Sequence, residues 1–254
     1  MINMPYRLIA ACAACMFAVS GWALDSIELP PGFSIEEYAS VPDARSMALG
    51  EQGTVFVSNK SGNSIFAVSN SENGVEVFEL IDGLETPNGI AVYDGDLYVA
   101  ENSRVTRYRD IETHLAEPPA AEVLDIDLPS EGWHGWRYIG FGPDGLLYIA
   151  IGAPCNICDK EGYANISRMN PDGSDREVYA HGVRNSVGFT WHPDNGELWF
   201  TDNGRDMLGD DVPPDELNNA TEAGQHFGYP YCHAGEFVDP KLGEGKACAD
   251  YRAP

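Results

Sequence analysis

The feature that most constrains the fold is a short hairpin pattern that occurs four times along the chain. Each copy has an apolar strand, a turn built on an acidic residue and glycine, and a second apolar strand. The glycine supplies the positive φ that a tight hairpin turn requires. The four copies are Met47–Val57, Ile90–Val99, Ile139–Ile149 and Phe189–Phe200. Their turn glycines follow one another at intervals of 42, 50 and 51 residues, in the order Gly53, Gly95, Gly145 and Gly196.

Further strands are predicted after the first three hairpins. Residues 64–68, 105–108 and 165–169 form third strands, and residues 75–80, 122–127 and 176–180 form fourth strands. Four strands in each unit of roughly 40–50 residues is the signature of a β-propeller. A flat β-sandwich would not repeat one hairpin at this period. We therefore predict an all-β propeller with four blades and the approach to a fifth at residues 224–231. Because a propeller hides its edge strands by closing into a ring, we expect the chain that stops at Pro254 to be a truncated portion of a longer protein.

The first 23 residues are typical of a secretory signal peptide. Arg7 precedes an apolar run from Leu8 to Val19, which is too short to span a bilayer, and cleavage is predicted after Ala23. An uncleaved anchor and a lipoprotein modified at Cys12 are the alternatives. The propeller domain is then expected to occupy residues 24–254, in the periplasm or outside the cell. No later segment is apolar enough to cross a membrane.

Charge and cysteine content narrow the partners and the compartment. The formal net charge of −25 argues against nucleic acid or an anionic membrane surface as a partner, and it is compatible with calcium. Four cysteines remain after the signal, and an even number in an exported chain predicts disulfides. Three pairings are possible, and proximity in the sequence favours Cys155–Cys158 and Cys232–Cys248. Asp159 follows the first pair, so it is not a haem attachment motif.

Three loops carry candidate functional residues. His134 lies between Gly and Trp residues directly before the third hairpin, where it can be a general base or a structural histidine. Arg184 and Asn185 occupy the same place before the fourth hairpin, and Arg184 can bind a carboxylate or quinone oxygen or form a surface ion pair. Residues 201–218 are rich in carboxylates, which suits either calcium or a solvated acidic loop. The spacing does not match an EF-hand.

Several common chemistries lack support in the sequence. The six histidines show no zinc-ligand spacing. Phosphate-binding and dinucleotide-binding glycine motifs are absent, and so is the nucleophile elbow of serine hydrolases.

The order of the loops resembles the soluble glucose and sorbosone dehydrogenases that depend on pyrroloquinoline quinone (PQQ). The likeness extends over nearly the whole mature chain, and it rests on the order and spacing of motifs rather than on any one of them. These motifs are Leu29–Ile35, the His134 loop before Phe141–Tyr148, His181–Asn185, Thr201–Arg205, Pro214–Asn218 and Gly224–Pro230.

The resemblance implies a six-bladed propeller with PQQ and calcium over its channel. His134 would remove the proton from a sugar hydroxyl while hydride passes to the quinone. Arg184 and Asn185 would hold and polarise PQQ. The main-chain carbonyls of Gly204 and Arg205 would bind calcium, a Lewis acid towards the quinone. The acidic pair that follows, Asp215 and Glu216, would be structural or would bind the cation.

The chain departs from the family pattern in two places. Residues 206–214 form a longer loop than in the glucose enzymes, closer to the sorbosone-type branch. The Lys and Arg residues that bind the PQQ carboxylates come from the last blades of the family, after the point where this sequence stops. The expected substrate is an aldose or sorbosone, and the sequence does not identify the electron acceptor.

Two other functions remain open. A calcium-dependent sugar lactonase would need inward oxygen ligands around one metal, which Glu101, Asn102, Asp202 and Asn203 could supply. A propeller without catalytic activity could instead bind a partner protein, and it would show neither calcium dependence nor quinone reduction.

Overall fold

A computed structural model describes residues 24, 26–59, 61–72 and 74–254. The predicted signal peptide lies outside the described residues. The chain divides into two compact units, residues 1–38 and residues 39–254, and the strands of the described residues belong to the second. In the first unit, the described residues 26–38 contain a turn at Pro31 and Gly32 and no strand. The predicted start of the domain at residue 24 stays a prediction.

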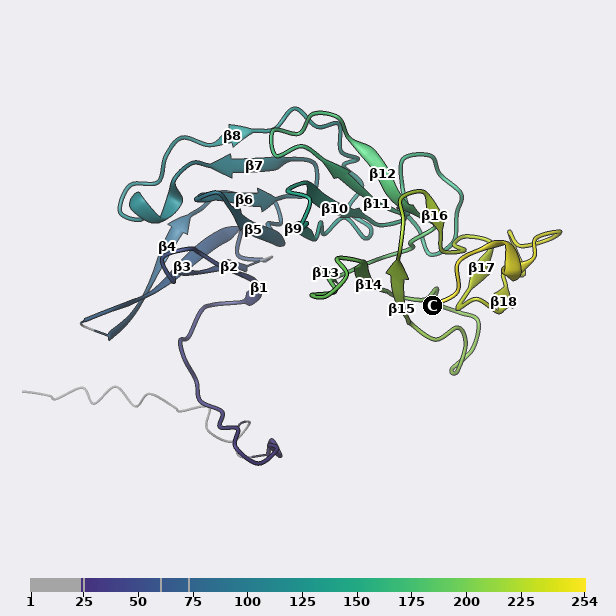
Figure 1. Cartoon of the computed structure of the whole chain (residues 1–254), viewed down its shortest axis with the longest axis horizontal. Helices are drawn as coiled ribbons and strands as arrows, with labels where there is room; N and C mark the ends of the chain where they lie inside the picture. Colours follow the sequence, from purple (N-terminus) through teal and green to yellow (C-terminus); the bar gives the residue numbers. More distant parts are fainter. Residues whose placement is uncertain (1–23, 25, 60, 73) are drawn as a thin grey trace, which may run out of the picture. The chain divides into compact units, whose positions relative to one another are not determined.

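The second unit consists of small, mostly antiparallel sheets that follow one another along the chain (Figure 1). The first two sheets have four strands each in simple sequence order. The first sheet contains β1 (Ala44–Leu49), β2 (Val55–Asn59), β3 (Ser64–Ser71) and β4 (Gly74–Ile81). The second sheet contains β5 (Gly89–Tyr93), β6 (Asp96–Ala100), β7 (Val105–Tyr108) and β8 (Glu122–Val123).

The later sheets are less regular. The third sheet contains β9 (Ile139–Phe141), β10 (Leu147–Ile151), β11 (Asn165–Met169) and β12 (Glu177–His181), and β16 (Gln225–His226) joins β12 in parallel. The fourth sheet contains β13 (Phe189–Trp191), β14 (Leu198–Asp202) and β15 (Glu216–Ala220). A final hairpin is made of β17 (Cys232–His233) and β18 (Phe237–Val238). Short 3₁₀ turns occupy Ile111–Thr113 and Cys248–Asp250.

The apolar core lies between consecutive sheets, as a propeller requires. Residues of β2, β6 and β10 are almost all buried because each of these strands is covered on both faces. Three clusters join the first sheet to the second, the second to the third and the third to the fourth. Representative members are Phe56 and Ile65 with Leu97 and Val99, Tyr98 and Val105 with Ile149 and Met169, and Tyr148 and Ile166 with Phe189 and Phe200.

The structure confirms the propeller prediction and its four repeated hairpins. All four repeated turn glycines have positive φ, from 72° to 94°. Both predicted disulfides form, with Cα–Cα distances of 6.1 Å for Cys155–Cys158 and 5.5 Å for Cys232–Cys248. Among the described residues, no helix is long and apolar enough to span a bilayer.

Two details differ from the predicted strands. The strand expected over residues 122–127 ends at Val123, because Leu124 turns into the core and its N–H donates to the Val105 carbonyl. Residues 224–231 were expected to approach a fifth blade. Within them, Gln225 and His226 instead add an edge to the third sheet.

Candidate functional site

His134 lies in the loop that enters β9, and its ring is fixed by two hydrogen bonds. Its Nδ1–H donates to the Ala153 carbonyl at 2.8 Å, and its Nε2 accepts from the Trp133 indole N–H at 3.0 Å. These bonds define a neutral imidazole with its lone pair on Nε2. Burial lowers the pKa of His134 below 6.5, and the positive charge of Arg184 lowers it further. A neutral imidazole near pH 7 is the form that can accept a proton.

Gly152 allows the His134 loop and the Asn185 loop to approach the end of β10. A Cβ atom at Gly152 would lie 2.6 Å from the His134 Cβ and 3.2 Å from the Asn185 Oδ1. Ala153 then links the two loops, because it accepts from His134 and its own N–H donates to the Arg184 carbonyl at 2.7 Å. Sequence analysis did not single out Gly152, although a glycine directly after a buried strand is a signal for close backbone approach.

Arg184 is buried, and its guanidinium is engaged by the protein itself. Its Nε and NH2 donate to the carbonyl and side-chain oxygens of Asn156 at 3.0 and 2.9 Å. Its NH1 donates to the carbonyls of Asn203 at 3.0 Å and Gly204 at 2.8 Å. An ion pair with Asp206 at 3.3 Å completes the set. Arg184 therefore cross-links three loops, and its contact with PQQ stays a prediction.

Asp202, at the end of β14, fixes the main chain of Arg184 and Asn185. Its two carboxyl oxygens accept the N–H of Arg184 at 2.8 Å and that of Asn185 at 2.6 Å. Burial and the neighbouring Glu216 raise the pKa of Asp202 to about 8, although both N–H bonds favour the carboxylate. The side-chain amide of Asn185 makes no hydrogen bond within the described part of the chain, so it is available to a ligand.

The predicted calcium residues are held by internal contacts. Gly204 donates its N–H to the Asp215 carboxylate at 2.8 Å. Arg205 turns its side chain to the buried Asp239 at 2.6 Å. Glu216 accepts from the Ala234 N–H at 2.6 Å and from the Asn218 amide at 2.8 Å. Within the described ranges, no three His, Cys, Asp or Glu side chains gather as a metal site.

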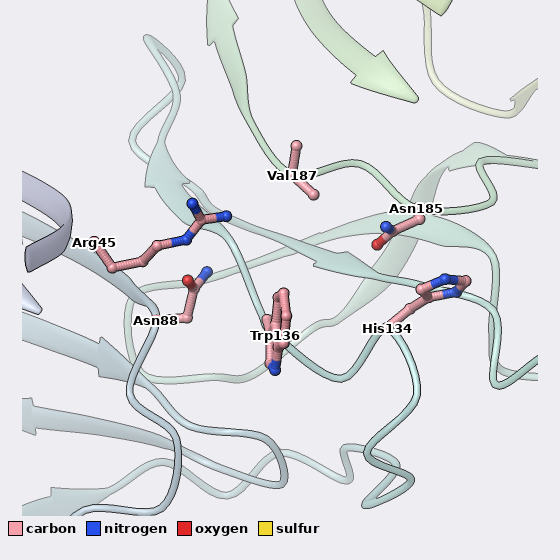
Figure 2. A pocket seen from close by; sticks show the side chains of 6 residues that line it. All are labelled: Arg45, Asn88, His134, Trp136, Asn185 and Val187. Carbon is pink, nitrogen blue, oxygen red and sulfur yellow. The ribbon is translucent and has the colours of Figure 1, made fainter. Parts of the chain in front are cut away.

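A pocket brings some of the predicted residues together (Figure 2). It contains about 390 Å³ of empty space, part of which is open to solvent. His134 and Asn185 lie on one side of it, Arg45 and Asn88 lie on the other, and Trp136 stands between them. Val187 also lines the pocket. Arg184, Gly204, Arg205, Asp215 and Glu216 do not line it.

The lactonase interpretation gains no support from the side-chain partners. The Glu101 carboxylate is fully buried and accepts from Arg104 and from the Glu85 N–H. Asn102 donates to the Ser130 carbonyl at 2.7 Å. Asp202 and Asn203 instead accept hydrogen bonds from Arg184. Among the described residues, no three His, Cys, Asp or Glu side chains gather around one point where such a metal could bind.

Asn156, inside the Cys155–Cys158 loop, is a positioning residue that sequence analysis missed. Besides binding Arg184, its Oδ1 accepts the Asp206 N–H at 2.8 Å. We expect Asn156→Ala to lower the free energy of unfolding by about 1–3 kcal/mol, because it removes the side-chain oxygen that accepts from the buried Arg184 NH2, whereas the main-chain carbonyl that accepts from Nε remains. Denaturant unfolding measures the change. Asn70→Ala is the matched control, since Asn70 is exposed at the end of β3. Equal stability of the two variants would contradict this role.

Comparison with known proteins agrees with the fold and the order of loops. The sequence pattern of glucose/sorbosone dehydrogenases matches residues 100–254. An uncharacterised protein of Borreliella burgdorferi is 30% identical over an alignment that covers 81% of this chain and 57% of that protein. The chain thus spans little more than half the length of this relative.

Solved structures show the same fold at lower identity. A Trichoderma reesei carbohydrate-active enzyme of family AA12 is 19% identical, with a TM-score of 0.72 over 83% of this chain and 65% of that one. The PQQ-bound aldose sugar dehydrogenase of Streptomyces coelicolor is 23% identical, with a TM-score of 0.61 over 85% and 67% of the two chains. These likenesses define the class, a β-propeller. The chain belongs, more narrowly, to the glucose/sorbosone dehydrogenase family.

Proposed function

We propose that this protein oxidises a sugar with PQQ and calcium, and that His134 is the base. The observation that carries the proposal is a neutral histidine held by the Ala153 carbonyl in a pocket that also contains the free amide of Asn185. A sugar hydroxyl that donates to Nε2 of His134 would lose its proton to that nitrogen. A hydride would leave the carbon that bears this hydroxyl, and PQQ, when bound, would accept it. The alcohol would thus lose one proton to His134 and one hydride, with its two electrons, to PQQ, and would become a carbonyl.

The residues that line the pocket could make some of the contacts that PQQ needs. The Asn185 amide can donate to a quinone oxygen, and Trp136 offers an aromatic face in the same pocket. Arg184 directly precedes Asn185 in the chain. Burial lowers the pKa of His134, and the charge of Arg184 lowers it further, so both favour the base form. The pocket is therefore arranged to hold a polar, planar group beside a proton acceptor.

The protein offers fewer oxygen ligands for calcium than the ion requires. A carbonyl oxygen has two lone pairs, so the Gly204 carbonyl can accept from Arg184 and retain one for a cation. The Arg205 carbonyl offers a second oxygen. Since calcium takes six to eight oxygen ligands, water or the cofactor would have to supply the others.

The Nε2 of His134 is occupied by the Trp133 indole N–H in this structure. Trp133 is more than half exposed, so its side chain can move away when a substrate hydroxyl arrives. We propose that the substrate displaces this contact. The periplasmic or secreted location and the signal peptide stay predictions, which the two disulfides favour.

Titration of the purified chain with PQQ and calcium, followed by dye reduction with a panel of aldoses, tests the proposal. We expect saturable PQQ binding, sugar-dependent dye reduction and an increase in Tm when calcium is added, because a ligand of the native state stabilises it. A melting temperature unchanged by calcium or EDTA would remove the metal from the proposal. Absence of both calcium-dependent stabilisation and PQQ-dependent dye reduction would favour a propeller that binds a partner protein.

A further inference from the structure

Arg45 reaches the pocket through an irregularity in β1. In the pairing of β1 with β2, Ala44 lies opposite Asn59 and Met47 lies opposite Val57, so β1 contains one extra residue. A β-bulge of this kind redirects a side chain away from the regular alternation of the strand. Figure 2 shows the Arg45 side chain extending over Asn88 on the side of the pocket opposite His134. In the described part of the chain, its guanidinium has no ion-pair or hydrogen-bond partner.

Asn88 presents an unsatisfied acceptor beside Arg45. It is only 5% exposed, and its amide nitrogen donates to the Arg137 carbonyl at 3.0 Å. Its side-chain oxygen is buried and has no partner among the described residues. A buried polar atom without a partner costs about 1–3 kcal/mol, and such atoms are uncommon in native proteins. Asn88 lines the pocket, so a rotation of its amide would bring this oxygen to a ligand hydroxyl that donates to it.

The charge of the pocket is opposite to that of the protein. The chain has 40 acidic and 15 basic side chains. Among the six lining residues, however, Arg45 is the charged one, and none is acidic. An unpaired guanidinium in such a pocket favours an anion, because its N–H groups form strong hydrogen bonds with carboxylate or phosphate oxygens.

We propose that Arg45 and Asn88 form a subsite for the acidic end of an anionic sugar, such as a uronic acid. The carboxylate binds Arg45, a neighbouring hydroxyl donates to Asn88, and the hydroxyl to be oxidised lies at the opposite end, next to His134. The placement of the reacting end rests on the proposed function. The recognition of the acidic end rests on Arg45 and Asn88 alone.

Calorimetric binding of D-glucuronate and D-glucose to the full chain tests the subsite, because these sugars differ only in the carboxylate at carbon 6. We expect glucuronate to bind about 10- to 100-fold more tightly, the range that a charge-assisted hydrogen bond supplies. Arg45→Gln should abolish this preference, and Arg45→Lys should retain part of it. Lys241→Gln is the matched control, since Lys241 is exposed and does not line the pocket. Added salt should reduce the preference.

Three results would overturn the subsite: equal affinity for the two sugars, a preference that survives in Arg45→Gln, or a loss of PQQ affinity in Arg45→Gln with sugar binding unchanged. The last would show that the carboxylate at Arg45 belongs to the cofactor. Dye reduction separates this inference from the proposed function. Arg45-dependent binding of glucuronate without its oxidation would support the subsite and contradict the proposed dehydrogenase activity. Oxidation of the sugar with no dependence on Arg45 would support the dehydrogenase activity and contradict the subsite.

Discussion

Replacement of His134 by asparagine is expected to lower kcat about 10²- to 10⁴-fold, the usual contribution of a general base. Asparagine is the appropriate substitute because His134 has a φ of 50°, a left-handed conformation that asparagine tolerates. It cannot accept the proton, so the loss should appear in kcat. PQQ affinity should change little, because Asn185 and Trp136 remain in place. Steady-state dye reduction by the PQQ-loaded protein measures the effect.

Trp133→Phe is the matched control for this variant. It removes the indole N–H that occupies Nε2 of His134 but leaves the base itself. We expect its turnover to stay within the range of the unsubstituted protein. If His134→Asn and Trp133→Phe had equal and nearly unchanged turnover, His134 would not be the base.

The pH profile gives a second measurement on the same residue. Burial and the charge of Arg184 hold the pKa of His134 below 6.5, so the neutral base is already the main form at pH 7. As pH falls through this lowered pKa, the imidazole takes up a proton and kcat/KM should decrease. The acid limb of the profile should therefore have its midpoint below pH 6.5, and it should be absent from the residual activity of His134→Asn.

Local sequence patterns were sufficient to predict the fold. The repeated turn glycines and the apolar strands beside them interact within one hairpin, so each blade can be recognised from a short segment. The fourth strand of the second blade was harder to predict. It ends at Val123 because Leu124 packs into the core between two sheets. That core also contains residues far along the chain, which a local pattern does not reveal.

The candidate site could be predicted only where its residues stand in recognisable loops. His134 and Asn185, which occupy equivalent places before two hairpins, line one pocket. The partners of Arg184 were not predictable, because Asn156 and Gly204 lie 28 and 20 residues away and contact it through the fold. Arg45 was missed for a similar reason, since only the pairing of β1 with β2 reveals the bulge that directs it.

Removal of the buried carboxylate of Asp239 is expected to destabilise the protein strongly. It accepts from the Arg205 guanidinium at 2.6 Å, from the His233 Nε2 at 3.0 Å, and from the N–H groups of Lys241 and Leu242 at 2.8 and 3.0 Å. Asp239→Ala would leave a largely buried arginine without its counterion. Breaking a buried ion pair in this way costs about 3–5 kcal/mol, and denaturant unfolding should show a loss of that size.

The same residue should contribute to acid unfolding. Burial alone would raise the pKa of Asp239, but the hydrogen bonds from His233 and Arg205 outweigh it and lower the pKa to about 2. Because the unfolded-state pKa is near 3.9, the stabilisation is complete above that pH and is lost as pH falls towards 2. The difference in unfolding free energy between the unsubstituted protein and Asp239→Ala should therefore shrink below about pH 4.

Two further variants distinguish the ion pair from a general effect of substitution. Asp250→Ala removes an exposed carboxylate close in sequence and should change stability by less than about 0.5 kcal/mol. Asp239→Asn keeps an acceptor for Arg205 but removes the charge. The loss of unfolding free energy in this variant should therefore lie between the losses in Asp250→Ala and Asp239→Ala. A cost for Asp239→Ala as small as that of Asp250→Ala would mean that Arg205 finds another partner. In that case the loop of Gly204 and Arg205, the predicted calcium site, would not depend on Asp239 for its position.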